Sequence, residues 1–394
     1  MERRRLMRND DILYDFWWAC IGGGYSMPLC RLAMEAGSAR HIYEMKEKSL
    51  FKLKGVTERC AAMIKKHREE FDIETEYEKS LKKGIRFIPY HSSSFPERLR
   101  RISGHPFAIF VKGEVPLDDR PSVALIGARN CSEYGRKVAS MLGESLAERG
   151  IPVVSGMAYG IDGTAQMACL KAGGLSYGVL GSGVDVCYPE ANREIYDRLC
   201  LQGGVISEYG PQTMPRACLF PARNRLIAGL SDLVVVVEAR ARSGTGITVD
   251  MALDQGKDVA VIPGRITDPL SEGCIRLWKQ GAIPVSSVED IIDLLEEKYG
   301  KLSERGETEE TSDTIKRGDE KGEGVRKSGK TNGGKYVPSE NEARVLETLD
   351  YYAKSTEILC EESGLDILEF MRAVMMLMAG GFAKELGKGY YVKI

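Results

Sequence analysis

The feature that most constrains the fold is a regular alternation of short apolar runs and helical patterns between residues 121 and 299. The run at 233–237 is Leu-Val-Val-Val-Val. A continuous β-branched run is typical of a strand covered on both faces, as in parallel sheets with helices on each side. We therefore expect an α/β domain with a doubly wound parallel sheet. Its predicted strands are 123–127, 152–155, 176–180, 204–207, 233–238, 259–263 and 282–285.

The rest of the chain divides around this domain, because 394 residues are more than one core usually serves. Residues 1–83 show short helical patterns between glycine turns, which predicts a small N-terminal helical domain. Residues 84–299 comprise a proline-punctuated lead-in strap and the α/β domain. Residues 300–335 are charged, glycine-rich and poor in large apolar side chains, which predicts a flexible linker. Residues 336–394 show three helical patterns and a glycine-turned hairpin, which predicts a winged-helix-like domain.

Each outer domain carries a segment with two open interpretations. In the N-terminal part, Leu53-Lys54-Gly55-Val56 precedes a helical pattern. Such a hairpin either presents backbone N–H groups to a DNA phosphate or simply connects two helices. In the C-terminal part, the predicted recognition helix at 366–378 is methionine-rich and partly acidic, which favours a protein-contact or structural role over duplex binding.

Composition excludes several classes of function. The formal net charge of −2 excludes a protein that grips nucleic acid through bulk positive charge, although a local basic pocket is compatible with it. No apolar run approaches the roughly 20 residues of a membrane helix, and no signal peptide is evident, so we expect a cytoplasmic protein without a membrane partner. The ten cysteines show no Cys-x-x-Cys pair, and the four histidines all precede residue 121, so no metal site is expected.

Glycine, hydroxyl and arginine residues follow the predicted strands. In an open parallel sheet the carboxyl ends of the strands face one crevice, so we expect these turns to meet. Glycine admits an anion to the backbone, serine adds a hydroxyl donor, and arginine adds a bidentate fork for phosphate oxygens. The sequence therefore predicts a site for several phosphates, built from Gly127-Ala128-Arg129, Ser155-Gly156, Ser243-Gly244 and the segment Phe-Pro-Ala-Arg-Asn-Arg at 220–225.

Catalytic machinery is sparse around this predicted site. The chain lacks the Gly-x-Gly-x-x-Gly and Gly-x-x-x-x-Gly-Lys-Ser/Thr loops, which disfavours a dinucleotide cofactor and nucleotide triphosphate hydrolysis. The nearby acids are Asp162, Glu208 and Glu238, of which Asp162 and Glu238 are interpreted as structural carboxylates. We therefore expect binding without turnover and no cofactor. Phe220 is a candidate for stacking on bases, whereas Tyr188 is interpreted as a packed turn aromatic.

These segments together resemble the DNA-processing protein A (DprA, or Smf) family over residues 85–285. The resemblance runs through the segments at 123–129, 155–162, 188–189, 206–208, 220–231, 237–239, 243–246 and 261–264, and the Phe-Pro-x-Arg-Asn-Arg element at 220–225 is highly specific. The chain departs from the family pattern at Gln166, where histidine is usual, and at Val249, where alanine is usual.

The resemblance implies an extended Rossmann-like fold for the α/β domain and a non-enzymatic protein of natural transformation and DNA recombination. Such proteins bind and protect incoming single-stranded DNA, displace single-strand-binding protein and load the RecA recombinase, and they form homodimers. Carried over by position, the DNA pocket comprises Gly127, Arg129, Ser155, Gly156, Phe220, Arg223, Asn224, Arg225, Ser243 and Gly244. The dimer and recombinase surface is implied at Ile275, Leu277 and Trp278.

Two other functions remain open at this point. The same fold class includes nucleotide-monophosphate phosphoribohydrolases, whose site uses a Pro-Gly-Gly-x-Gly-Thr loop. Here Ser243-Gly244-Thr245-Gly246 lacks that proline and double glycine. The other alternative is a recruitment module, in which the C-terminal domain binds a protein partner.

Overall fold

The computed structural model describes residues 9–21, 29–300, 338–350, 354–387 and 389–393. The predicted linker falls almost entirely outside these ranges. The chain forms two compact units, one of residues 1–131 and 138–304 and the other of residues 132–137 and 305–394. Among the described residues no helix is long and apolar enough to cross a membrane.

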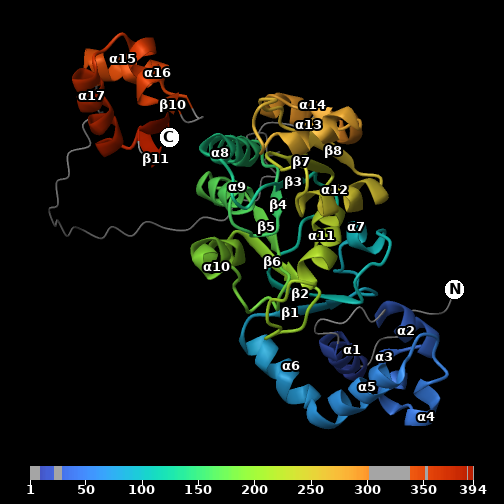
Figure 1. The fold of residues 1–394 in the computed structure, drawn as a ribbon. Coiled ribbons are helices and arrows are strands. Elements are labelled where there is room, and N and C mark those ends of the chain that lie inside the picture. The colour runs from blue at the N-terminus through green and yellow to red at the C-terminus, as the bar shows by residue number, and fades with distance from the viewer. Residues whose placement is uncertain (1–8, 22–28, 301–337, 351–353, 388, 394) are drawn as a thin grey trace, which may run out of the picture. The chain divides into compact units, whose positions relative to one another are not determined.

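A nine-stranded sheet forms the centre of the first unit (Figure 1). The strands lie in the order β1-β2-β6-β5-β4-β3-β7-β8-β9. Every pair of neighbouring strands among β3, β4, β5, β6, β7, β8 and β9 is parallel, which confirms the doubly wound fold. The bounds are β1 Arg86–Pro89, β2 Ala108–Gly113, β3 Val123–Ile126, β4 Val153–Ser155, β5 Ser176–Val179, β6 Gly203–Ser207, β7 Leu233–Val236, β8 Asp258–Val261 and β9 Ile283–Pro284.

The segment interpreted from sequence as a lead-in strap instead extends this sheet. β1 pairs antiparallel with β2, and β2 pairs antiparallel with β6. Residues 108–111 of β2 are all buried, so this short apolar run is an interior strand that covers the edge of the parallel sheet. The short helix α7 (Glu97–Arg100) lies between the two strands.

Helices cover both faces of the sheet (Figure 1). Helices α8 to α10 pack on one face, and α11 and α12 pack on the other with α7. Their bounds are α8 Glu133–Glu148, α9 Ile161–Lys171, η1 Glu190–Asn192, α10 Arg193–Leu201, α11 Leu219–Leu230, α12 Thr245–Asp254, α13 Glu272–Lys279 and α14 Val288–Tyr299.

The segment at 220–225, interpreted from sequence as a turn, lies inside α11. Leu219, Leu226 and Leu230 are buried at helical spacing. The packing of this apolar face in the core therefore favours a helix over a turn in this segment. Pro221 sits in the first turn of the helix, where a missing N–H costs nothing. This helical placement determines which of the segment's side chains reach the pocket described below.

Six N-terminal helices share a core with the edge of the sheet. Phe16 of α1 is fully buried, and its ring centroid lies 5.4 Å from that of Phe87 in β1 and 5.9 Å from that of Phe110 in β2. The helices are α1 Asn9–Ile21, α2 Leu29–Ala36, α3 Ala39–Glu44, α4 Glu47–Leu50, α5 Glu58–Glu70 and α6 Ile73–Lys82. The predicted boundary at residue 83 therefore lies just before a strand that packs on these helices.

The C-terminal unit has its own core, which includes Val345, Leu359, Phe370 and Val374. Among the described residues of this unit, three helices precede a hairpin, and the small sheet has the order β10-β12-β11. The bounds are α15 Glu340–Thr348, β10 Lys354–Ser355, α16 Thr356–Ser363, α17 Ile367–Ala379, β11 Ala383–Gly387 and β12 Tyr390–Lys393.

Candidate nucleic-acid interface

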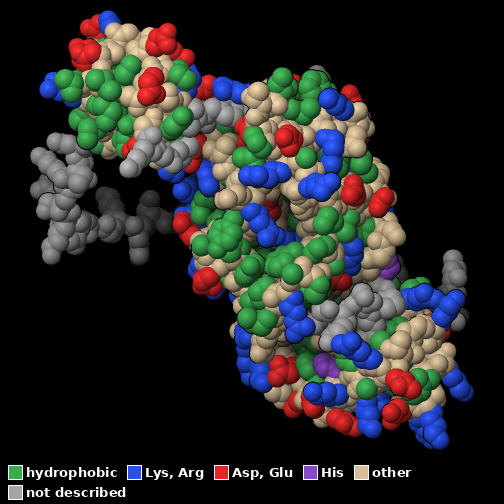
Figure 2. Space-filling view, in the orientation of Figure 1, with side chains coloured by type: hydrophobic (Ala, Val, Ile, Leu, Met, Phe, Trp, Pro, Cys, Tyr) green, Lys and Arg blue, Asp and Glu red, His purple; other side chains and the backbone are tan. Residues whose placement is uncertain are grey.

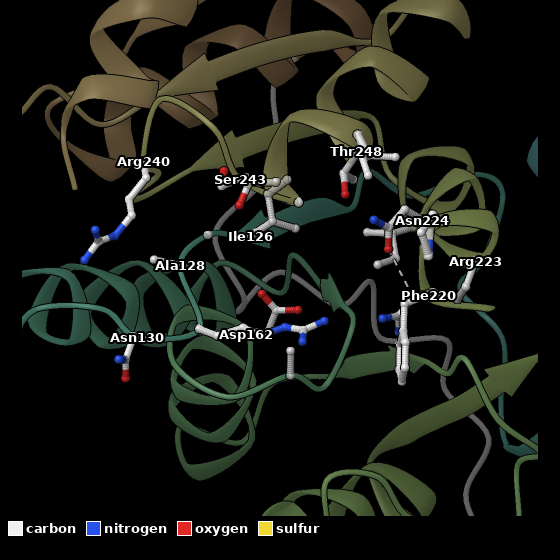
Figure 3. Close-up of a pocket in the computed structure, with 18 of the residues that line it drawn as sticks. Ile126, Ala128, Asn130, Asp162, Phe220, Arg223, Asn224, Arg240, Ser243 and Thr248 are labelled. Carbon is white, nitrogen blue, oxygen red and sulfur yellow. Dashed lines mark hydrogen bonds between the residues drawn. The ribbon is translucent and has the colours of Figure 1, made fainter. Parts of the chain in front are cut away.

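The carboxyl ends of β3, β4 and β7 open into a pocket of about 670 Å³, which we call the carboxyl-edge pocket (Figure 3). Its walls come from the loop after β3, the start of α9, the first half of α11 and the loop between β7 and α12. Distant stretches of the chain therefore meet at one rim. Seven of the ten predicted residues line it: Gly127, Arg129, Phe220, Arg223, Asn224, Ser243 and Gly244.

Arg223 places a fixed positive charge in this pocket. Its side chain is 4% exposed, and Nη1 donates to the backbone carbonyls of Gly156, at 3.0 Å, and Val179. Burial lowers the pKa of Arg223 to about 10, against the opposing effect of Asp162. The guanidinium is therefore protonated at neutral pH, and the carbonyl bonds hold it in place.

Asp162 organises the turn after β4. Its Oδ2 accepts the N–H of Gly156 at 3.1 Å. Burial raises the pKa of Asp162, while Arg223 and hydrogen bonds from the turn act to lower it. The carboxyl group is thus committed to local backbone groups, in line with a structural role.

Ser155 and Gly156, two of the predicted DNA-pocket residues, lie beneath the pocket and do not line it. Both are buried, and the Ser155 hydroxyl donates to the carbonyl of Leu125 in β3 at 2.6 Å. Gly156 binds Asp162 through its N–H and Arg223 through its carbonyl. These two residues therefore position the charged groups and are not themselves open to a ligand.

Arg129 and Phe220 lie close to each other in the pocket. Arg129 is exposed, and among the described residues its side chain has no ion pair or hydrogen bond. Its guanidinium carbon lies 5.7 Å from the Phe220 ring centroid, and that of Arg223 lies 5.8 Å from the same ring. Two guanidinium groups therefore lie within cation–π distance of one aromatic ring.

The interpretation of Tyr188 as a packed aromatic is wrong. Tyr188 is 45% exposed and lines the pocket, with its ring centroid 5.5 Å from that of Phe220. The pocket thus offers two neighbouring aromatic rings.

Gly160 allows the loops after β3 and β4 to lie against each other. Its φ is +73°, a conformation that favours glycine. A Cβ there would overlap the backbone carbonyl oxygens of Ala128 and Arg129. This close approach fixes the backbone that carries Arg129.

Arg225, predicted to line the DNA pocket, lies elsewhere. It pairs with Glu208 and donates from Nε to the carbonyl of Gly104 at 3.1 Å. Successive helical residues are rotated by about 100°, so Arg223 and Arg225 leave α11 in divergent directions. A turn at 220–225 would have imposed no such divergence, which explains the misplacement.

Arg240 follows the predicted strand at 233–238 but is not among the residues that the family resemblance assigns to the DNA pocket. It lies in the loop after β7, is exposed and lines the pocket opposite α11 (Figure 3). Its position after a strand end was the available signal. Arg129, Arg223 and Arg240 together line a pocket whose lining includes one carboxyl group, Asp162. The described residues hold no cluster of three His, Cys, Asp or Glu that could bind a metal ion.

A family model for DNA recombination-mediator protein A matches residues 86–296. The chain belongs to this family. DNA processing protein DprA of Streptococcus pneumoniae is 44% identical over 198 residues, which are 50% of this chain and 70% of that protein. DprA of Bacillus subtilis is 37% identical over 222 residues, which are 56% of this chain and 75% of that protein.

The comparison with solved structures agrees with this family assignment. The X-ray structure of DNA processing protein A from Streptococcus pneumoniae superposes with a TM-score of 0.61 and 34% identity, over 71% of this chain and 97% of that one. The family match contains every residue that lines the carboxyl-edge pocket. The match does not include α1 to α6 or residues 305–394.

The residues implied for the dimer and recombinase surface lie on α13, outside the pocket. Leu277 is 8% exposed and belongs to the core beneath the sheet, so its side chain is committed to its own chain. Trp278 is 49% exposed and Ile275 is half-buried. The latter two are the side chains on which an interface at this helix would depend.

Proposed function

We propose that the carboxyl-edge pocket binds the backbone of single-stranded DNA without sequence preference. The observation that carries the proposal is the convergence of Arg129, Arg223 and Arg240 on one pocket, in which Phe220 lies beside the first two and Asp162 is the opposing charge. Guanidinium groups bind phosphate oxygens in bidentate fashion, and an aromatic ring stacks on any base. Membership of the DNA recombination-mediator family supports the choice of DNA as the ligand.

The aromatic pair favours single strands over duplex DNA. Phe220 and Tyr188 lie side by side at the cavity, where an unpaired base can stack on either ring. In a duplex each base face is already covered by its neighbours, so these rings gain nothing. The proposed preference for single strands rests on this difference.

We propose that the protein acts by binding and not by breaking bonds. Asp162 holds the turn after β4, and its raised pKa follows from burial. A phosphoribohydrolase would instead need a carboxylate directed at a bound nucleotide. Release of free adenine from adenosine monophosphate by the purified protein would contradict this assignment and favour the hydrolase alternative.

The wider role we propose is that of a homodimeric, cytoplasmic mediator of transformation and recombination. It would protect incoming single strands, displace single-strand-binding protein and load RecA, with Ile275 and Trp278 at the interface. Family membership and the exposed Trp278 support this role. We retain the proposed architecture of a helical domain at 1–83, a DNA-binding domain at 84–299, a linker at 300–335 and a winged-helix-like domain at 336–394.

The test is a gel-shift comparison of single-stranded and duplex DNA of equal length at two salt concentrations. We expect tighter binding to the single strand, with an affinity that falls as salt rises because phosphate contacts release counterions. Equal affinity for both forms would contradict the role of the aromatic pair. Failure to bind either form at low salt would overturn the proposal.

A further inference from the structure

Residues 46–57, which comprise α4 and the turn that leads to α5 and which we call the α4–α5 hairpin, carry a cluster of cations that the carboxyl-edge pocket does not involve. Lys46, Lys48, Lys52 and Lys54 are all exposed, and their ammonium groups have no ion pair or hydrogen bond among the described residues. Between them Phe51 is 48% exposed. The hairpin thus places an accessible aromatic ring among four unpaired positive charges.

The hairpin is a structured element. Leu50, Leu53 and Ile64 are buried, which anchors both ends of the turn in the core of the N-terminal helices. The Thr57 hydroxyl accepts the N–H of Cys60 and caps α5. Gly55 has a φ of +93° and open space around it, so glycine is required there by the backbone and not by packing. The lysines therefore project from a defined backbone.

Most neighbouring carboxylates already have partners. Glu47 pairs with Lys65 at 3.5 Å, and Glu44 pairs with Arg40 at 2.9 Å. Glu35 accepts the backbone N–H of Lys54 at 2.8 Å. Glu58, exposed at the start of α5, is a further acid beside the hairpin. In a chain of net charge −2, four unpaired lysines within nine residues are a strong local concentration of positive charge.

Figure 2 shows Lys and Arg side chains projecting at the lower right of the view, over the N-terminal helices α4 and α5, with a few acidic side chains among them. Lysine ammonium groups on flexible stems suit phosphates at varied positions. An exposed ring among them can stack on an unpaired base, which a duplex does not offer.

We infer that the α4–α5 hairpin is a second contact surface for single-stranded DNA, which a strand long enough to extend beyond the carboxyl-edge pocket would reach. The inference rests on the proposed function of that pocket. The lysines contact phosphates, and Phe51 stacks on a base. Nothing in this surface reads a base edge, so the contact is independent of sequence.

The experiment compares oligothymidines of about 8 and about 40 nucleotides, because single-strand sites commonly span about 4–16 nucleotides. The full-length chain is used, and affinity is measured across a salt series. We expect Lys52→Gln with Lys54→Gln to weaken binding of the long strand only and to reduce the salt slope by about 1.4, at roughly 0.7 per lost contact. Phe51→Ala should weaken long-strand binding about tenfold.

The matched control is Lys79→Gln with Lys82→Gln on α6. It removes two exposed lysines of the same region that pair with Glu76 and Glu78. We expect it to leave the binding of both lengths unchanged, and thermal melting shows whether each variant is folded.

Three outcomes would overturn the inference. The wild-type chain could bind both lengths equally well, the hairpin variants could bind the long strand as the wild type does, or they could weaken both lengths alike, which would indicate an indirect effect on the fold. Each of these leaves short-strand binding by the wild type intact. Loss of the proposed function itself is different, because the wild type would then bind neither length.

Discussion

The two edges of the central sheet use arginine in opposite ways. At the amino edge, where β3 and β7 begin, Arg98 is buried and donates to Asp118, Asp232 and Ser122, and to several backbone carbonyls. At the carboxyl edge, Arg129 and Arg240 line a pocket and remain exposed. The same residue type is a structural clamp where acids surround it and a candidate ligand contact where they do not.

Two aspartates show the same contrast. Burial acts to raise the pKa of Asp232, but Arg98, the Tyr299 hydroxyl and the Ser122 amide together hold it below 3.8. For Asp162 burial prevails and the pKa is raised. An arginine alone therefore does not show a binding site. The balance of acidic and basic side chains around the arginine indicates whether it can bind a ligand.

The largest expected effect is on stability at the amino edge. Arg98→Ala leaves Asp232 buried without its main partner, and we expect a loss of about 3–5 kcal/mol in the free energy of unfolding, measured in urea. The neighbouring control Arg101→Ala removes an exposed pair with Glu97 and should cost at most about 1 kcal/mol. DNA binding by the folded Arg98→Ala protein should be unchanged, and a loss of affinity would break the contrast between the edges.

The next effect is on binding at the carboxyl edge. Phe220→Leu keeps an apolar side chain but removes the stacking face, so we expect a loss of about 1–3 kcal/mol in binding to single strands. Fluorescence anisotropy with a labelled oligonucleotide measures it, and duplex DNA is the control ligand. An equal loss for both ligands would mean that Phe220 acts through the fold and not through bases.

The aspartates predict opposite pH dependences of stability. The contribution of Asp232 is present above pH 3.8 and is lost as the pH falls through its lower folded pKa. The contribution of Asp162 is present below pH 3.8 and is lost as the pH rises through its higher folded pKa.

Urea unfolding between about pH 3 and pH 7 should therefore give two curves of opposite slope. The stability advantage of the wild type over Asp232→Asn should grow as the pH rises, whereas its advantage over Asp162→Asn should shrink. Each unit of pKa shift corresponds to about 1.4 kcal/mol. Slopes of the same sign for both variants would show that the two edges do not differ electrostatically as described.

The smallest expected effect is that of Arg225→Ala, which tests whether Arg225 lies outside the DNA site. Because it pairs with Glu208, Arg225→Ala should cost about 1 kcal/mol of stability and leave the salt dependence of DNA binding unchanged. A double-mutant cycle with Glu208→Gln measures the coupling. If Arg225→Ala reduced the salt slope of DNA binding as much as Arg129→Ala does, Arg225 would belong to the DNA site.

The sequence predicts the parallel sheet well, because buried β-branched runs such as Leu233–Val236 leave little choice of structure. It also predicts the meeting of the strand-end loops, which follows from topology alone. Helix periodicity in the segment at 219–230 was masked by Pro221, so the opposite directions of Arg223 and Arg225 could not be seen. The exposure of Tyr188 depends on how its ring meets Phe220, which is a matter of tertiary packing.

The central claim is that Arg129 is a phosphate contact. The most direct test is the salt dependence of single-strand binding by Arg129→Ala, with thermal melting as the check on folding. The account predicts weaker binding, a slope smaller by roughly 0.7 and an unchanged melting temperature. Binding equal to that of the wild type at every salt concentration would contradict it.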